Sequence, residues 1–348
     1  MKKFLAIALC VLMIATSVVG LASCGKADKS DDTAEKSYVF TTGGAQGTYY
    51  GFTNVVANTL TSAIDGAKFT AVTSGGSKAN IEALDDGDAQ FAIVQNDVMI
   101  NAYNGKSNFE GNTITSFSVI GAVYPEVCQI IASKDSGIKS VYDLKGKRVS
   151  IGAQGSGVVT NATQILEKHG ITLEDITVQN LDSGASASAM KEGKLDAFFF
   201  TGGVPTPAIQ ELESGKLGIT IVSLDADKIA ELQAESEFYV QVDMDNEIYK
   251  SIPAGEISSA VAVTATYIVS DDVDEETAYK VTKALWEKQA EIAAAHKTGA
   301  AMNINTALLG MANVPVNAGA KRYYEEYLAK YNADNGTSLT FDEFYYAK

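Results

Sequence analysis

YVFTTGGAQGTYYGF, residues 38–52, joins a strand, a glycine loop and a helix within a few residues, and this unit decides the fold. Tyr38 to Phe40 is a short β-prone run. The polar, glycine-rich loop 41–48 follows, and an amphipathic helical pattern then continues to Leu60. A strand that passes through a glycine turn directly into a helix is typical of α/β folds.

The same order recurs along the chain, each time as an apolar run, a loop rich in hydroxyl, amide or glycine residues, and a helical pattern. The further copies are FTAVTSGGS (69–77), FAIVQND (91–97), VSIGAQGSG (149–157) and AFFFTGG (197–203). We expect Asp97 to cap the helix that follows the third strand. Strands that alternate with helices predict parallel sheets, whose ligands bind at the carboxyl ends of the strands.

The loops have a composition that suits an anion such as a carboxylate. Glycines let the backbone approach a ligand closely and expose its N–H groups, and helix N-termini add partial positive charge. Any one loop taken alone is better explained as an ordinary strand-to-helix turn with an N-cap. Five loops of the same chemistry favour a binding cleft.

Two long extended segments predict a connection between two groups of repeats. One has β-like runs at 117–122 and 127–132, interrupted by Tyr124-Pro125-Glu126, and the other is SAVAVTATYIVS at 259–270. Two extended crossings between the same pair of α/β units make a two-strand hinge. We therefore predict an α/β protein with two lobes, lobe one formed by 38–125 and 260–348 and lobe two by 126–259.

The first residues predict export. Lys2 and Lys3 precede an almost unbroken apolar run, 4–20, and Leu21-Ala22-Ser23-Cys24 is a lipobox. An ordinary signal peptide or a transmembrane anchor is the alternative. The apolar run is barely long enough to span a bilayer, and no basic stop-transfer cluster follows it.

A lipobox predicts a lipoprotein. We expect residues 1–23 to be removed as a signal peptide, Cys24 to carry a diacylglyceryl group, and 24–37 to form a polar, flexible tether. Two acyl chains are enough for stable anchoring, so the protein is expected outside the cytoplasm, held to the outer face of the cell membrane.

Composition excludes several function classes. The chain has 27 Lys+Arg against 43 Asp+Glu, a net charge of −16, which phosphate backbones would repel, so no nucleic-acid partner is expected. It has 2 His and 3 Cys and no P-loop, dinucleotide fingerprint or nucleophile elbow. We expect no metal, no cofactor and no catalysis. The rival is an exported enzyme that uses a carboxylate such as Glu126 or Asp97.

Arginine is scarce, and this limits how a ligand is held. Arg148 and Arg322 are the only two, so backbone N–H groups and Ser or Thr hydroxyls must receive a ligand carboxylate. Glu126, at the expected hinge, is placed to receive a ligand ammonium, with Tyr124 or Tyr49 supplying an aromatic face. From the pattern alone, a solvated loop acid is an equal alternative for Glu126.

Several stretches, in family order, resemble the TAXI family, the substrate-binding proteins of a class of TRAP transporters. They are TTGGAQGTYYGF (41–52), TSGGSKANIEALDDGDAQFAIVQND (73–97), GAVYPEVCQIIASKDSGIKSVYDLKGKRVSIGAQGSG (121–157) and FFFTGGVPTPAIQEL (198–212). The likeness covers essentially all of 38–348, although DLKGKRV is shared with other extracytoplasmic binding proteins. It implies a type II periplasmic-binding-protein fold whose lobes close around a small solute and deliver it to an ion-coupled TRAP-type permease. A binding protein of an ABC-type importer is the nearest alternative.

The resemblance also implies a ligand and a set of site residues. Some family members bind glutamate or glutamine, so an acidic amino acid or a dicarboxylate is expected. Val158 and Val159 depart from the more polar residues that other members carry after the GSG sequence. By motif position, the pocket draws on Gly47, Thr48, Tyr49, Ser74, Gly75, Gly76, Ser77, Gln95, Asn96, Tyr124, Glu126, Ser156, Gly157, Thr160, Thr201 and Gly202.

Overall fold

The computed structural model describes residues 35–236 and 238–346. The predicted signal peptide, the predicted lipidation site Cys24 and most of the predicted tether lie outside these residues. The tether was expected to extend to residue 37, whereas the first strand already begins at Lys36. The reason is that Lys36 and Ser37 continue the parallel ladder, opposite Ala67 and Lys68 of the neighbouring strand.

Strands and helices alternate through most of the described chain. The strands are β1 Lys36–Thr41, β2 Ala67–Val72, β3 Phe91–Gln95, β4 Phe117–Ser133, β5 Arg148–Ser150, β6 Thr177–Gln179, β7 Ala197–Gly202, β8 Ile219–Ile221, β9 Val240–Met244 and β10 Ser258–Ser270. The α-helices are α1 Thr48–Ala63, α2 Ser77–Asp85, α3 Asn96–Asn104, α4 Gly157–Lys168, α5 Ser183–Lys191, α6 Pro207–Ser214, α7 Ala226–Glu235, α8 Glu275–Glu287, α9 Gln289–Ala295, α10 Ala318–Asn335 and α11 Phe341–Tyr345. Short 3₁₀ turns are η1 Ser107–Phe109, η2 Lys134–Ser136, η3 Val141–Leu144, η4 Leu173–Asp175, η5 Lys297–Ala301 and η6 Ile304–Thr306.

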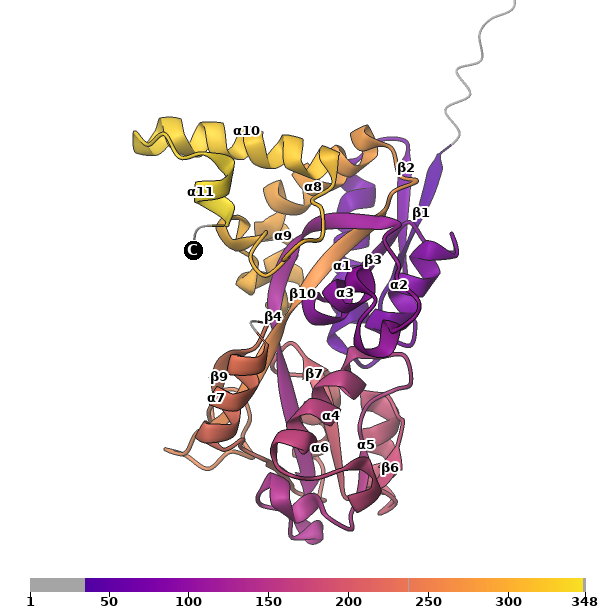
Figure 1. Cartoon of the computed structure of the whole chain (residues 1–348), viewed down its shortest axis with the longest axis vertical. Coiled ribbons are helices and arrows are strands. Elements are labelled where there is room, and N and C mark those ends of the chain that lie inside the picture. The colour runs from indigo at the N-terminus through magenta and orange to yellow at the C-terminus, as the bar shows by residue number, and fades with distance from the viewer. Residues whose placement is uncertain (1–34, 237, 347–348) are drawn as a thin grey trace, which may run out of the picture. The chain divides into compact units, whose positions relative to one another are not determined.

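One mixed sheet runs through these elements in the order β2-β1-β3-β10-β4-β7-β5-β6, with β8 against β4 and β9 against β10. At one end β1 pairs in parallel with β2 and β3, and at the other β5 pairs in parallel with β6 and β7. The long strands β4 and β10 pair antiparallel with each other and connect the two parallel groups (Figure 1). The expected α/β class and two-strand connection are therefore present.

Strand β4 differs from the prediction. Tyr124-Pro125-Glu126 was expected to interrupt two separate runs, but β4 continues from Phe117 to Ser133. Pro125 lies opposite Thr264 of β10, next to a shift of register between Ala265 and Thr266. Because proline offers no N–H to a ladder, it is tolerated in a strand where the pairing is already irregular.

The hydrophobic residues divide between the two ends of β4 and β10. Residues of β4 up to Tyr124 and of β10 from Ala265 onward pack in one core with α1–α3 and the C-terminal helices. Residues of β4 from Val127 and of β10 up to Val263 pack in two smaller clusters with the elements between them in the chain. We call the parts of the chain around the first core lobe one and those around the other two lobe two.

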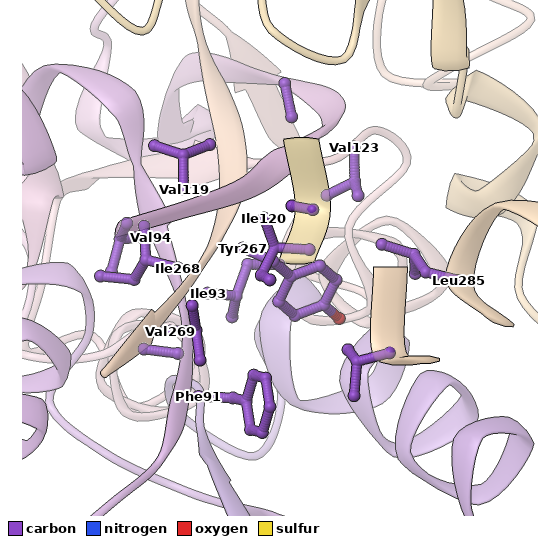
Figure 2. Close-up of a cluster of buried hydrophobic side chains, with 14 of the residues drawn as sticks. Phe91, Ile93, Val94, Val119, Ile120, Val123, Tyr267, Ile268, Val269 and Leu285 are labelled. Atoms are coloured by element: carbon purple, nitrogen blue, oxygen red, sulfur yellow. The ribbon is translucent and has the colours of Figure 1, made fainter. Parts of the chain in front are cut away.

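Side chains from β3, β4 and β10 meet in the core of lobe one, as Figure 2 shows. Phe91, Ile120 and Tyr267 come from these three strands, and each is 1% exposed or less. The Tyr267 hydroxyl is satisfied by Thr53 of α1, 2.9 Å away. Strands buried on both faces read as continuous apolar runs, which explains the sequences FAIV and ATYIV.

Asn80 of α2 holds the strand ends of lobe one together. Its buried Nδ2 donates to the carbonyls of Thr42, at 2.6 Å, and Ile93, at 2.7 Å. Its Oδ1 accepts from the Ser74 hydroxyl at 2.5 Å. One side chain thus fixes the loops after β1 and β2 relative to β3.

We expect Asn80→Ala to lower the free energy of unfolding by about 2–4 kcal/mol, because buried carbonyls lose their donor. Urea denaturation measures the change. Asn58→Ala, at an exposed position of α1, is the matched control and should stay close to wild type. Equal effects of the two substitutions would contradict this account of Asn80.

Candidate ligand-binding site

A cavity of about 250 Å³ lies among the loops that follow β1, β2, β3, β5 and β7. All but four of the predicted site residues line it. From lobe one and β4 these are Gly47, Thr48, Tyr49, Ser74, Gly75, Gly76, Ser77, Gln95 and Glu126, and from lobe two they are Ser156, Gly157 and Thr201. The loops meet because the carboxyl ends of parallel strands lie at one edge of each parallel group.

Asn96 is one of the four predicted residues that do not line the cavity. Its Oδ1 accepts from the Thr264 backbone N–H at 2.9 Å, and its Nδ2 donates to the Gly310 carbonyl at 3.2 Å. Thr264 is the residue opposite Pro125, so Asn96 supplies a partner where the ladder is irregular. Asn96 is a structural residue of the hinge.

Tyr124, Thr160 and Gly202 also lie away from the cavity lining. Tyr124 is buried in lobe one, where its ring packs edge-on against Phe52 with the centroids 5.1 Å apart. Thr160 lies a turn into α4, beyond the residues that reach the cavity. Gly202 ends β7 and pairs with Val127.

The cavity has further lining residues that were not among the predicted site residues. They are Gly43, Gly44, Gly152, Ala153, Val158, Leu181, Asp182, Ser183, Phe199 and Phe200. Leu181–Ser183 follows β6, a strand too short to give a β pattern. The signal that would have identified this loop is Asp182 before a run of small residues, since its side chain caps α5 by accepting from the Ala185 N–H at 2.8 Å.

Two helices present uncapped N-termini to the cavity, one from each lobe. The first-turn N–H groups of α1 and α4 have no side-chain cap and no main-chain acceptor outside their helices among the described residues. By contrast, two first-turn N–H groups of α2 donate to the Gly155 carbonyl, and α5 has its Asp182 cap. An open helix N-terminus is a ready anion site, so α1 and α4 together suit a carboxylate.

The lobes touch around the cavity. The Gly155 carbonyl of lobe two accepts from the N–H groups of Lys78 and Ala79 in lobe one, at 3.0 and 3.2 Å. The Thr48 hydroxyl donates to the Gly203 carbonyl at 3.4 Å. These contacts describe a closed arrangement in which a solute would be enclosed by both lobes.

Glu126 is the most buried ionisable side chain with a carboxyl group in the lining of the cavity. It is 1% exposed, and its Oε2 accepts from the Tyr49 hydroxyl at 2.6 Å. Burial raises the pKa of Glu126 well above its usual range, the Tyr49 hydrogen bond opposes this rise, and the nearby Asp97 adds to it. The predicted alternative, a solvated loop acid, is therefore wrong.

Asp97 lies behind the cavity at a contact between the lobes. It was expected to be a helix cap, but the N-cap of α3 is Gln95 and Asp97 lies in the first turn. Its Oδ2 accepts from Asn161 Nδ2 of α4 at 3.0 Å, and Asn161 Oδ1 accepts from the Thr201 hydroxyl at 2.9 Å. Burial raises the pKa of Asp97 to about 6, although the Val98 backbone N–H and Asn161 partly compensate.

The family is shown by comparison with known proteins. The model of the NMT1-like family matches residues 40–327. The chain belongs to the NMT1-like family. This match spans both lobes and all the loops that form the cavity.

Solved structures with a similar fold are distant in sequence. A protein from Bordetella bronchiseptica RB50 is 17% identical, with a TM-score of 0.53, covering 85% of this chain and 99% of that one. The alkanesulfonate-binding protein SsuA from Xanthomonas axonopodis pv. citri, bound to MOPS, is 16% identical, with a TM-score of 0.42, covering 84% and 83%. The GluR0 ligand-binding core from Nostoc punctiforme, in complex with L-glutamate, is 14% identical, with a TM-score of 0.46, covering 75% and 97%. The fold predicted for this NMT1-like protein, two α/β lobes joined by two long strands, is confirmed by its own strand order and by its separate cores.

Two features are absent from the described residues. No helix within 35–236 or 238–346 has the length and apolarity needed to cross a bilayer. The same residues contain no group of three or more His, Cys, Asp or Glu side chains arranged to hold a metal ion.

The buried carboxyl of Asp97 gives a pH-dependent prediction. Its pKa of about 6 in the fold exceeds the 3.8 of a free side chain, so folding favours the protonated form and the ionised form costs stability at higher pH. We expect Asp97→Asn to stabilise the protein at pH 7.5 by up to about 3 kcal/mol, and this gain to disappear as the pH falls from 6 toward 4.

Urea denaturation at pH 4.5 and 7.5 measures the difference. Exposed Asp88→Asn is the matched control and should show no comparable gain. If Asp97→Asn changes the free energy of unfolding by the same amount at both pH values, the raised pKa of Asp97 is wrong.

Proposed function

We propose that this protein is an extracytoplasmic solute receptor that captures a small carboxylate-bearing solute by lobe closure and delivers it to a membrane permease. The solute is a glutamate- or glutamine-like amino acid or a dicarboxylate. The observation that carries the proposal is the meeting of two uncapped helix N-termini, α1 from lobe one and α4 from lobe two, at one cavity.

A carboxylate between α1 and α4 links binding to closure. Each helix N-terminus alone carries about half a positive charge and attracts an anion weakly in water. When the lobes close, both termini act on the same anion in a water-poor space, where the attraction is larger. A ligand that interacts better with the closed than with the open form shifts the population toward closure.

The delivery step is proposed from the sequence resemblance. The glycine-loop motifs of residues 41–52 and 73–97 resemble the TAXI family, which favours an ion-coupled TRAP-type permease as partner. The stretch DLKGKRV at 143–149 is shared with other binding proteins, so an ABC-type importer is the alternative partner. A lipid on Cys24 would keep the receptor at the membrane surface beside either permease.

A thermal-shift screen of amino acids and small organic acids tests the proposal. A ligand present at a hundred times its Kd stabilises the folded state by about 2.7 kcal/mol, so we expect a rise of several degrees in Tm for at least one carboxylate. Amines and sugars without a carboxylate are the controls. If no carboxylate shifts the Tm, and protein purified under native conditions contains no small solute, the proposal is wrong.

Gly157→Ala tests whether closure contributes to affinity. A Cβ at Gly157 of α4 would lie 1.9 Å from Oε1 of Gln95 and 2.8 Å from Cγ2 of Val98, both in lobe one. The lobes would have to separate or repack, so we expect about 10- to 100-fold weaker binding of the screened ligand by calorimetry.

Gly51→Ala in α1 is the matched control, because its Cβ would make an ordinary contact 3.4 Å from His296 Nε2. It should bind as wild type does. Unchanged affinity of Gly157→Ala would contradict the closed arrangement as the binding state.

A further inference from the structure

We infer that the solute of this cavity carries a protonated amine as well as its carboxylate, that Glu126 receives this amine, and that the rest of the solute is uncharged. The inference rests on the proposed function and narrows its ligand class. It favours a neutral amino acid over a dicarboxylate.

The charged side chains that line the cavity are all acidic. Glu126 and Asp182 line the cavity, and no Lys, Arg or His side chain does among the described residues. A dicarboxylate would place two more negative charges beside them, with only the N-termini of α1 and α4 to receive both. A zwitterion offers one carboxylate to those helices and one cation to the acids.

Glu126 is an incompletely paired carboxyl that faces the cavity. The Tyr49 hydroxyl donates to its Oε2, and no described residue donates to its Oε1. The titratable groups around it are Tyr49 on α1, Tyr124 and Cys128 on β4, and Asp97 on α3, and none of them is a cation. A carboxyl that is buried without a cation is costly, and a ligand ammonium would supply the missing charge and hydrogen bonds.

Tyr49 belongs to both proposed sites, the one for the solute's carboxylate and the one for its amine. Its backbone N–H belongs to the uncapped first turn of α1, and its hydroxyl holds Glu126. The carboxylate and amine sites are thus fixed to the same residue, which sets their separation and favours a molecule that carries both groups. A solute with only one of them would leave a buried group without a partner.

The rest of the lining combines apolar side chains with neutral polar ones such as Ser77, Gln95 and Thr201. Val158, Leu181, Phe199 and Phe200 contribute to the lining, and no cation stands among them. A second carboxylate on the solute would be desolvated there without a counter-ion, and the other acid of the lining, Asp182, already caps α5 by accepting from the Ala185 N–H. The substituent is therefore uncharged.

Calorimetry with matched pairs tests the inference on the full chain at pH 7.5. The probes are L-leucine, L-glutamine and L-glutamate, each against its 2-oxo acid, together with succinate. We expect one of the neutral amino acids to bind most tightly, about 30-fold or more better than its 2-oxo acid. We expect Glu126→Gln to lose most of this preference and Glu110→Gln, at an exposed position, to keep it.

The outcomes separate the inference from the proposed function. If succinate or a 2-oxo acid binds most tightly, or if Glu126→Gln keeps the preference for the amino acid, Glu126 does not receive a ligand amine. The proposed receptor function is not affected by either result. Tightest binding by L-glutamate overturns the uncharged substituent. No binding of any probe, with no solute in natively purified protein, overturns the function itself.

A second measurement keeps the test independent of the variant's folding. Mass spectrometry of the solute released from natively purified wild-type protein should find a nitrogen-containing zwitterion. A released solute without an amine overturns the inference whatever Glu126→Gln does. The variant itself is expected to fold, because a neutral amide keeps the shape of a buried carboxyl that has no cation beside it.

Discussion

The antiparallel pairing of β4 with β10 is the constraint on which the cavity depends. Each of these strands contributes side chains to the cores of both lobes, so neither lobe can be completed without them. Along β4 the change occurs between Tyr124, packed in lobe one, and Val127, packed in lobe two. Glu126 lies at this change and belongs to none of the three cores, and its side chain lines the cavity.

The sequence predicts the features that depend on local chemistry. A strand, a glycine loop and a helix within a dozen residues identify the loops after β1 and β5, because backbone conformation and helix capping are set by near neighbours. The topological rule for parallel strands then brings those loops together without knowledge of any contact. For this reason most residues of the glycine loops line the cavity, including Thr48 and Gly157.

The sequence does not predict contacts between distant segments. The hydrogen bond from Tyr49 to Glu126 joins residues 77 positions apart, and the loop Leu181–Ser183 reaches the cavity only because β6 pairs with β5. Asn96 shows the opposite error, because it was predicted to line the cavity and does not. It stands in a loop motif, yet its amide is used to complete an irregular ladder opposite Pro125, a need that appears only when β4 and β10 are paired.

The net charge of −16 and the cavity follow different physical rules. Most of this charge is carried by exposed side chains, and salt screens its effect beyond about 8–10 Å, so it says little about which small solute the cavity holds. Inside the cavity, the partial charges at α1 and α4 and the carboxyl of Glu126 act over a few ångströms. Little water lies between them, so the energy of each electrostatic interaction is larger than at the surface. In the proposed function, a solute is selected by the match of its own charges to that arrangement. An acidic protein can for this reason hold a carboxylate, provided that helix ends receive it and that its acidic groups meet a cation.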